Sequence, residues 1–267
     1  MRLVTTFPNR AEGEKAMGFL GSLSLPFTVL SPDPGYARVA VPAIVVDEEV
    51  RSRVASQAAQ CFYCSGWVDY QPAMRSVPDS RPPEFGPDVF GQVAIMVLQP
   101  CMADPTKIRA IAQIAGDLSE VFPYMNAVAH DAFYNPQGPT FTWMDGYRMI
   151  TLYPRRIAVA KADEIVDLWR VLELLRVRLN TCWQRRGAIT PSFTLRKRPP
   201  ALEIYYRLPR TNCGACGDTT CLAFAFKLWG GLTTLFKCQP VFSGDYGHLE
   251  EALLEICAGL GVRKEQP

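Results

Sequence analysis

The feature of this 267-residue chain that most constrains its fold is a group of closely spaced cysteines. The group follows the spacing C-x2-C-x4-C-x16-C and consists of Cys213, Cys216, Cys221 and Cys238. Thiolates are the ligands of iron–sulfur clusters, and a [4Fe–4S] cube needs four of them around one small volume. Gly214 and Gly217 let the intervening backbone curl tightly and direct N–H groups toward sulfur. The chain therefore has to fold so that four thiols converge.

The residues between the third and fourth cysteines make this convergence possible. Asp218, Thr219 and Thr220 are good helix N-caps, and residues 221–229 have the pattern of a helix that stops at Gly230–Gly231. Such a helix carries the chain roughly 15 Å away, at about 1.5 Å per residue. The segment 231–238 spans about 26 Å when extended, enough to bring Cys238 back. The helix N-terminus also opposes the negative charge of a thiolate-bound cluster.

The segment from residue 208 to 240 resembles the [4Fe–4S] domain of the large subunit of the corrinoid iron–sulfur protein and of the B subunit of the Rnf electron-transport complex. Matching positions are Leu208, Pro209, Thr211, Asn212, Cys213, Gly214, Cys216, Gly217, Cys221 and Cys238. Gln239 separates Cys238 from Pro240, where many members have proline next. The resemblance implies a [4Fe–4S] cluster on the four cysteines and an electron-transfer role. It does not extend to corrinoid binding, because the D-x-H-x-x-G motif is absent and the remaining chain is too short for the accompanying barrel.

Two alternatives to a cluster stay open for the four cysteines. Four-cysteine zinc sites are common, but they usually consist of two C-x2-C knuckles, and the second knuckle is missing here. The third possibility is that these thiols are free.

A second cysteine feature is the pair Cys61 and Cys64. With Cys101 and Cys182 it would supply four ligands for a second metal or cluster site. A thioredoxin-type motif fits poorly, since that motif sits between a strand and the helix it opens. Ordinary packing of free thiols is the interpretation that we favour, because free cysteine is among the most buried residue types.

Composition excludes several classes of protein. Nine cysteines without a signal peptide argue against a disulfide framework and indicate a reducing, cytoplasmic compartment. No apolar run approaches the ~18 residues of a membrane span, so no membrane association is expected. A net charge of +2 predicts no obligatory polyanion partner, which makes nucleic acid an unlikely ligand.

The expected fold class is α+β, with one or two small α/β sandwich units followed by a small C-terminal cluster domain. The pattern predicts an N-terminal α/β domain (1–70), a proline-rich linker (71–91) and a second α/β domain (92–190). A basic linker (191–207) and a cluster domain with a C-terminal helix (208–267) are expected to follow.

Individual elements follow from periodicity and capping signals. Asn9 with Glu12 predicts a helix start, Asp47 predicts another, and residues 148–152 and 157–160 predict a hairpin. Further predictions are a helix after Asp104–Pro105 with Ile108, Ile111, Ala115 and Leu118 on one face, a strand at 126–132, a long helix at 163–183 and a strand at 202–206.

Two other groups have chemical possibilities. His130 and Asp131 could form an acid–base pair, but adjacent strand residues point to opposite faces, so a structural role is favoured. The basic residues Arg196, Lys197, Arg198, Arg207 and Arg210 could dock an acidic electron carrier, or form a solvated linker, which is the favoured interpretation.

The sequence as a whole indicates an iron–sulfur protein that transfers low-potential electrons to a partner enzyme, or assists it, in anaerobic one-carbon or corrinoid metabolism. The expected redox partner is a flavodoxin, a ferredoxin or a corrinoid or one-carbon enzyme. No nucleotide-binding glycine motif and no catalytic residue is identified, so an accessory protein is favoured over a catalyst. The alternative is a zinc-binding scaffold or maturation protein without a redox role.

Overall fold

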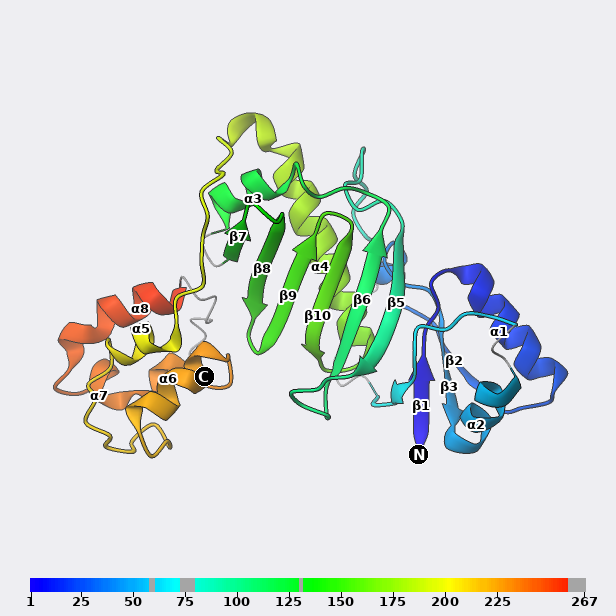
Figure 1. The fold of residues 1–267 in the computed structure, drawn as a ribbon, viewed down its shortest axis with the longest axis horizontal. Coiled ribbons are helices and arrows are strands. Elements are labelled where there is room, and N and C mark those ends of the chain that lie inside the picture. The colour runs from blue at the N-terminus through cyan, green and yellow to red at the C-terminus, as the bar shows by residue number, and fades with distance from the viewer. Residues whose placement is uncertain (58–60, 73–79, 130–131, 259–267) are drawn as a thin grey trace. The chain divides into compact units, whose positions relative to one another are not determined.

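The structure is a computed structural model that describes residues 1–57, 61–72, 80–129 and 132–258. By its internal contacts the chain divides into two compact units (Figure 1). Unit 1 comprises Met1–Val121 and Leu152–Gly187, and unit 2 comprises Phe122–Thr151 and Ala188–Pro267. Each unit is therefore built from two separate stretches of the chain. The domain boundaries expected from the sequence stay a prediction.

Unit 1 begins with a four-stranded antiparallel sheet of order β2-β3-β1-β4. Its strands are β1 (Arg2–Thr5), β2 (Thr28–Leu30), β3 (Ala43–Asp47) and β4 (Val68–Asp69), and its helices are α1 (Arg10–Ser22) and α2 (Glu48–Gln57). The element order β-α-β-β-α-β with this strand order is the split β-α-β arrangement. Apolar residues from the strands and both helices, including Phe7, Leu20 and Ile44, form its core.

Both helix starts predicted for this sheet are confirmed. The Asn9 side chain accepts a hydrogen bond from the backbone N–H of Glu12 at 3.0 Å. The Asp47 carboxylate accepts one from the N–H of Val50 at 2.8 Å. Each bond satisfies an N–H group that has no partner inside its helix, which is why the sequence signal is reliable here.

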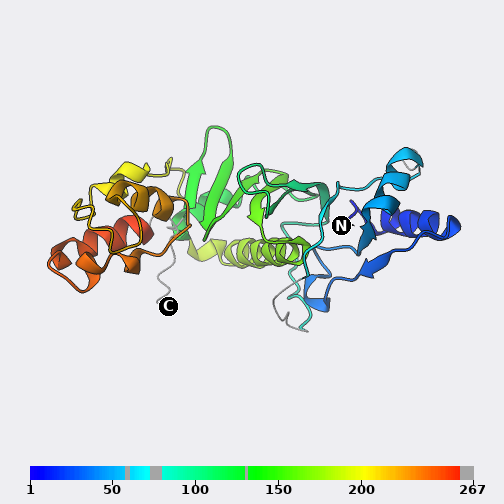
Figure 2. The same ribbon diagram turned by 90° about the horizontal axis from the view of Figure 1, so that it is seen from below.

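A second sheet has six strands in the order β5-β6-β10-β9-β8-β7. The strands are β5 (Val93–Pro100), β6 (Ile108–Ile114), β7 (Ala132–Asn135), β8 (Thr140–Asp145), β9 (Arg148–Tyr153) and β10 (Arg156–Ala162). The long helix α4 (Ile165–Gln184) runs along one face of this second sheet, against β10, as Figure 2 shows. It buries Leu168, Leu172 and Leu175, so the predicted long helix and its apolar stripe are confirmed, as is the hairpin β9–β10.

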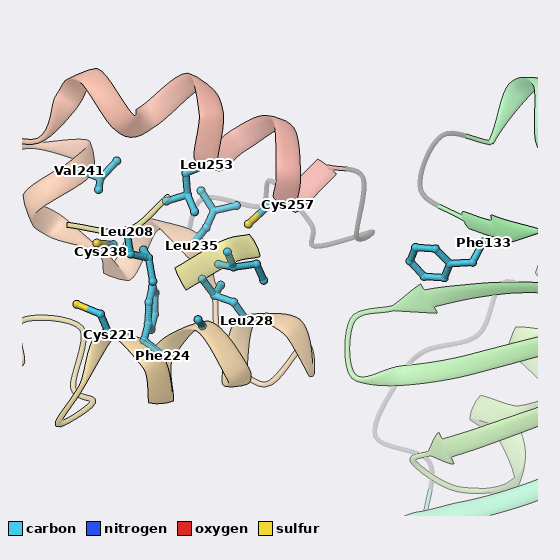
Figure 3. Packing of buried hydrophobic residues seen from close by; sticks show 12 residues of the cluster. Phe133, Leu208, Cys221, Phe224, Leu228, Leu235, Cys238, Val241, Leu253 and Cys257 are labelled. Atoms are coloured by element: carbon cyan, nitrogen blue, oxygen red, sulfur yellow. The ribbon is translucent and has the colours of Figure 1, made fainter. Parts of the chain in front are cut away.

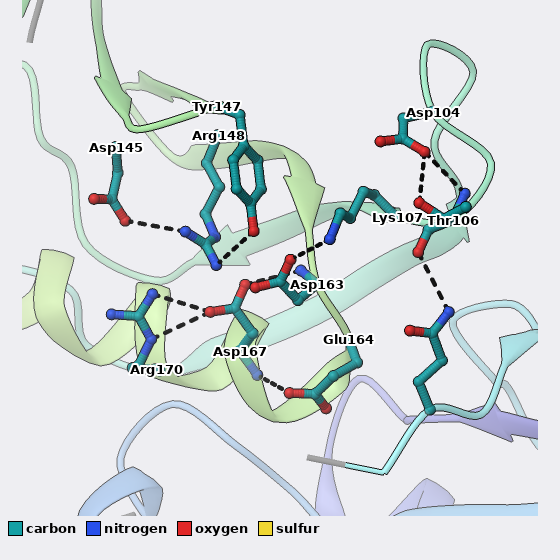
Figure 4. A network of polar contacts seen from close by, with 11 residues as sticks. Asp104, Thr106, Lys107, Asp145, Tyr147, Arg148, Asp163, Glu164, Asp167 and Arg170 are labelled. Atoms are coloured by element: carbon teal, nitrogen blue, oxygen red, sulfur yellow. Dashed lines mark hydrogen bonds and ion pairs between the residues drawn. The ribbon is translucent and has the colours of Figure 1, made fainter. Parts of the chain in front are cut away.

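Polar contacts fix the start of α4 (Figure 4). The Glu164 carboxylate accepts hydrogen bonds from the N–H groups of Val166 at 2.7 Å and Asp167 at 2.8 Å. Burial, the largest effect on this group, raises the pKa of Glu164. Lys107 pairs with Asp163 at 2.6 Å, which joins the turn before β6 to the residues before α4.

The described part of the proline-rich segment is also held to α4. The Arg176 side chain is 1% exposed and contacts the carboxylates of Asp88 at 2.6 Å and Glu173 at 2.7 Å. It also donates to the backbone carbonyl of Pro83 at 2.8 Å. A buried guanidinium with these partners ties the segment to the helix instead of leaving it as a free linker.

Three predicted elements are wrong. Residues 108–118 do not form a helix, because β6 buries Ile108, Ala110, Ala112 and Ile114 in alternation, the period of a strand. The strand expected at 126–132 begins instead as helix α3 (Phe122–Val128), and the strand expected at 202–206 is helix α5 (Ala201–Tyr205).

The rest of unit 2 is helical, with α6 (Cys221–Trp229), α7 (Gln239–Phe242) and α8 (Glu250–Ala258). Their buried side chains share one apolar core (Figure 3) that includes Phe224, Leu228, Leu235, Val241 and Leu253. The whole protein is thus a mixed α and β structure with two antiparallel sheets. Among the described residues, no helix combines the length and the apolar character needed to cross a membrane.

The basic segment before α5 is bonded within unit 2. Arg196 pairs with Tyr134 through the backbone at 3.0 and 2.9 Å, and its guanidinium donates to the carbonyls of Ala129 and Asn126. Arg198 stacks on the ring of Trp229, with its guanidinium carbon 3.5 Å from the ring centre. The interpretation of these two arginines as part of a solvated linker is therefore wrong.

Candidate metal centre

All four cysteines of the C-x2-C-x4-C-x16-C group line one pocket. Its empty volume is about 300 Å³, part of which is open to solvent. The remaining lining residues are Pro209, Thr211, Gly214, Asp218, Phe224 and Pro240. Cys221 and Cys238 are buried, Cys216 is half-buried and Cys213 is exposed. The pocket is therefore lined by two buried thiols, one half-buried thiol and one exposed thiol.

Left-handed backbone conformations bend the loop that carries the first two thiols. Asn212, Gly214 and Gly217 have φ angles of +52°, +73° and +88°. Gly217 donates its N–H to the carbonyl of Gly214 at 2.9 Å, which closes a tight turn around Cys216. Glycine adopts this region without a steric penalty, so the glycines of the motif are required by the curvature.

Helix α6 begins at the third thiol and is capped from two directions. The Thr220 hydroxyl accepts from the N–H of Ala223 at 3.1 Å, so Thr220 is the cap among the three candidates. The Asn212 side chain accepts from the N–H of Cys221 at 2.9 Å. This bond holds the cysteine loop against the helix start, and so brings Cys213 and Cys221 to the same pocket.

The chain returns to the pocket through the pair of glycines after α6. Gly231 has a φ of +68°, and a Cβ atom placed on it would lie 2.1 Å from the carbonyl oxygen of Gly146 in the β8–β9 turn. Only glycine fits this backbone approach. The N–H of Cys238 then bonds the carbonyl of Leu235 at 3.1 Å, which fixes the fourth thiol at the start of α7.

The protein environment shifts the pKa values of two of the thiols in opposite directions. A hydrogen bond from the Ala215 N–H has the largest effect on Cys213 and lowers its pKa, and a smaller effect in the same direction comes from the Thr211 side chain. Burial raises the pKa of Cys238 to about 11, and charge on the other three thiols adds to the rise. Four thiolates so close together repel one another, and bound metal cations would reverse the sign of that effect.

One carboxylate also lines the pocket. Asp218 is 8% exposed, and its charge is balanced by an ion pair with Lys227. From its place in the sequence, Asp218 was expected only as a helix cap. The spacing of nine residues between Asp218 and Lys227, across the start of α6, carries no recognisable signal.

The donor set and the space fit an iron–sulfur cluster. Four thiols, no histidine and a mostly apolar wall suit a cube in which each thiolate binds a different iron atom. Within the described ranges, no three His, Cys, Asp or Glu side chains lie close enough together to hold one metal ion.

The absence of such a group among the described residues also applies to Cys61, Cys64, Cys101 and Cys182. Cys61 is exposed, Cys64 is half-buried, and Cys101 and Cys182 are buried. Burial raises the pKa of Cys182. Ordinary packing of these thiols, the interpretation favoured from the sequence, stays a prediction, whereas the first set shares a pocket.

The other candidate groups are placed as follows. His130 and Asp131 lie outside the described residues. Cys257, the ninth cysteine, is completely buried in the core of unit 2, and burial raises its pKa to about 12. A thiol of this kind is inert and serves packing.

Comparison with known proteins gives the class of the thiol-bearing segment. Residues 208–240 match the family described as "Putative Fe-S cluster". This is the segment that carries the four thiols, so the resemblance noted from the sequence is confirmed there.

Particular relatives match over short stretches of the chain. The corrinoid/iron-sulfur protein large subunit of Moorella thermoacetica is 57% identical over 40 residues, which cover 15% of this chain and 9% of that protein. The acetyl-CoA decarbonylase/synthase complex subunit gamma of Methanothermobacter thermautotrophicus is 46% identical over 54 residues, covering 20% and 12%. Subunit gamma 2 of Methanosarcina thermophila is 41% identical over 71 residues, covering 23% and 15%.

These matches span a small part of each relative, at most 15% of the length of the three. No solved structure matches the chain. The relatives therefore describe a short stretch of this chain and not the whole of it.

Proposed function

We propose that the protein binds one [4Fe–4S] cluster through Cys213, Cys216, Cys221 and Cys238 and transfers single electrons to or from a partner enzyme. The convergence of these four thiols on one pocket carries the proposal. The family match of the same segment supports it. A bound cluster of this type would supply a centre that gains and loses one electron at a time.

The chain's own residues would prepare the pocket for such a group. Asn212 and Thr220 hold the start of α6, whose positive end faces the thiolates and offsets their charge. Phe224 is 1% exposed and forms part of the pocket wall, where it limits the access of water. Lys227 neutralises Asp218, which would otherwise add a negative charge beside the thiolates.

The relatives suggest the metabolic setting. Their names link this type of segment to a corrinoid/iron-sulfur protein and to an acetyl-CoA decarbonylase/synthase complex. We therefore infer an accessory protein of anaerobic one-carbon or corrinoid metabolism, with a flavodoxin, a ferredoxin or an enzyme of that metabolism as its partner. A cytoplasmic location follows from the need to keep the ligating thiols reduced.

Purification without oxygen tests the proposal. We expect a brown protein with a broad visible absorption band and about four irons and four sulfides per chain. A colourless protein with one zinc per chain would overturn it, and would favour the zinc-binding scaffold instead.

A further inference from the structure

The segment that forms the thiol pocket, residues 208–242, has an uneven distribution of charge. Between Leu208 and Phe242 the basic residues are Arg210, Lys227 and Lys237, and the acidic residue is Asp218 alone. Asp218 is buried and paired with Lys227. This segment therefore presents cations to solvent without an exposed carboxylate of its own.

Each of these three cations is adjacent to the wall of the pocket. Arg210 lies between Pro209 and Thr211, which both line the pocket, and Lys237 precedes Cys238. Lys227 is bonded to the pocket residue Asp218. Arg210 and Lys237 are exposed and have no ion-pair partner within the described part of the chain. We call Arg210, Lys227 and Lys237 the cationic rim.

Helix α6, which carries Cys221 and Lys227, also exposes two apolar side chains. Leu222 follows the ligand candidate Cys221 directly and is 37% exposed, and Phe226, one turn later, is 55% exposed. The opposite face of the helix buries Phe224 and Leu228 in the core, as Figure 3 shows. Neither Leu222 nor Phe226 is needed for that core. Apolar anchors beside charged groups are typical of docking surfaces between proteins.

We propose that the cationic rim, with Leu222 and Phe226, docks an acidic electron-carrier protein whose carboxylates surround an apolar patch. The inference rests on the proposed function and names the surface and the chemistry of the partner. The reaction in the complex is the transfer of one electron. The carrier is oxidised by one electron, the bound cluster is reduced by one, and no covalent bond is made or broken.

Charge complementarity decides the kind of partner. Attraction between opposite charges raises the rate at which the two proteins meet, and added salt weakens that attraction. The apolar contact is insensitive to salt. The surface also avoids Arg196 and Arg198, whose guanidinium groups are occupied inside unit 2. Of the basic residues for which the sequence suggested docking, Arg210 is the one that belongs to the cationic rim.

The test is binding of the cluster-loaded protein to an oxidised acidic flavodoxin, measured by calorimetry at low and high ionic strength. The double variant Arg210→Glu/Lys237→Glu should raise the Kd about tenfold or more at low ionic strength and much less at high ionic strength. Phe226→Ser should raise the Kd by roughly tenfold at both ionic strengths.

A matched control separates docking from net charge. Arg81 and Arg185 are exposed residues of unit 1, and Arg81→Glu/Arg185→Glu changes the net charge by the same amount. We expect its Kd to stay within about twofold of the wild type. Equal losses in both double variants would show that only overall charge matters and would overturn the docking surface.

Iron content decides between the two proposals before binding is measured. A wild-type protein without iron would contradict the proposed function itself. If the Glu variant loses iron, the neutral pair Arg210→Gln/Lys237→Gln takes its place. An iron-loaded variant that binds the flavodoxin as tightly as the wild type overturns the docking surface alone. The docking surface is also overturned if the wild-type protein binds a single-stranded oligonucleotide through the rim more tightly than it binds the flavodoxin.

Discussion

The two groups of four cysteines in this chain have the same number of thiols and very different surroundings. Cys213, Cys216, Cys221 and Cys238 line one pocket, on a loop and helix whose bends and caps come from neighbouring residues. The second group, Cys61, Cys64, Cys101 and Cys182, has the same range of burial, but it is spread over more than a hundred residues of sequence. The difference teaches that a short motif with its own caps and glycines can be interpreted locally, whereas cysteine number alone cannot.

The largest expected effect is the loss of metal from the first group. Cys216→Ser, and the same change at each of the other three positions, should remove or degrade the cluster, because a hydroxyl is a poor substitute for a thiolate on iron. Iron and sulfide analysis with visible spectra measures it. Cys257→Ala is the control, since this thiol lies in the apolar core. A variant that keeps all its iron and an unchanged spectrum would remove its residue from the ligand set.

A second test uses thiol reactivity in the metal-free protein. At pH 8, iodoacetamide should modify Cys213 at least about 100-fold faster than Cys257, because the thiolate is the reactive form. Cys213 is exposed with a lowered pKa, whereas burial raises the pKa of Cys257 to about 12. The modification rate of Cys257 should therefore rise as the pH increases from 9 toward 12. Mass spectrometry of the peptides gives both rates, with exposed Cys61 as reference. Similar rates at pH 8 would show that the two environments do not differ.

The second group is tested by removing its exposed pair. Cys61→Ala/Cys64→Ala should leave iron and zinc content unchanged and lower the free energy of unfolding by about 1–2 kcal/mol, because these thiols act as small apolar groups. Metal analysis and urea denaturation measure the two quantities. A loss of about four irons per chain would instead reveal a second cluster and erase the contrast between the groups.

The smallest effect concerns the local bonds that shape the first group. Asn212→Ala removes the hydrogen bond to the N–H of Cys221 and should cost about 1 kcal/mol of stability in the metal-free protein. Thr219→Ala is the neighbouring control, since the hydroxyl that caps α6 belongs to Thr220. Equal denaturation midpoints for the two variants would show that Asn212 does not help to hold the loop.

The sequence predicted the thiol-bearing segment well because its signals are local. Thr220 and Gly230 bound α6 at the residues where the pattern places its ends. Outside this segment, Ile108 and Ile111 fit a helical face as well as a strand. The alternate burial of β6 becomes visible only when β5 and β10 pair with it.

Distant contacts explain the other errors. The Asn126 side chain of α3 donates to the carbonyls of Ser192 at 2.9 Å and Thr194 at 3.0 Å. Arg196 donates to the carbonyls of Asn126 and Ala129. These partners lie more than sixty residues apart in the chain. Neither propensity nor charge pattern could reveal that a basic stretch is bonded to a short helix.

The discontinuity of unit 2 has a consequence for the order in which the protein is made. The ribosome releases residues 122–151 long before the segment 188–267 that completes the same unit, with 152–187 belonging to unit 1 in between. The β8–β9 turn is therefore synthesised before Gly231, the residue that packs against the carbonyl of Gly146. Under the proposed function, cluster loading needs the finished pocket and is therefore a late step of biogenesis. A shortened expression fragment that starts in the basic segment would lack the strands against which it folds.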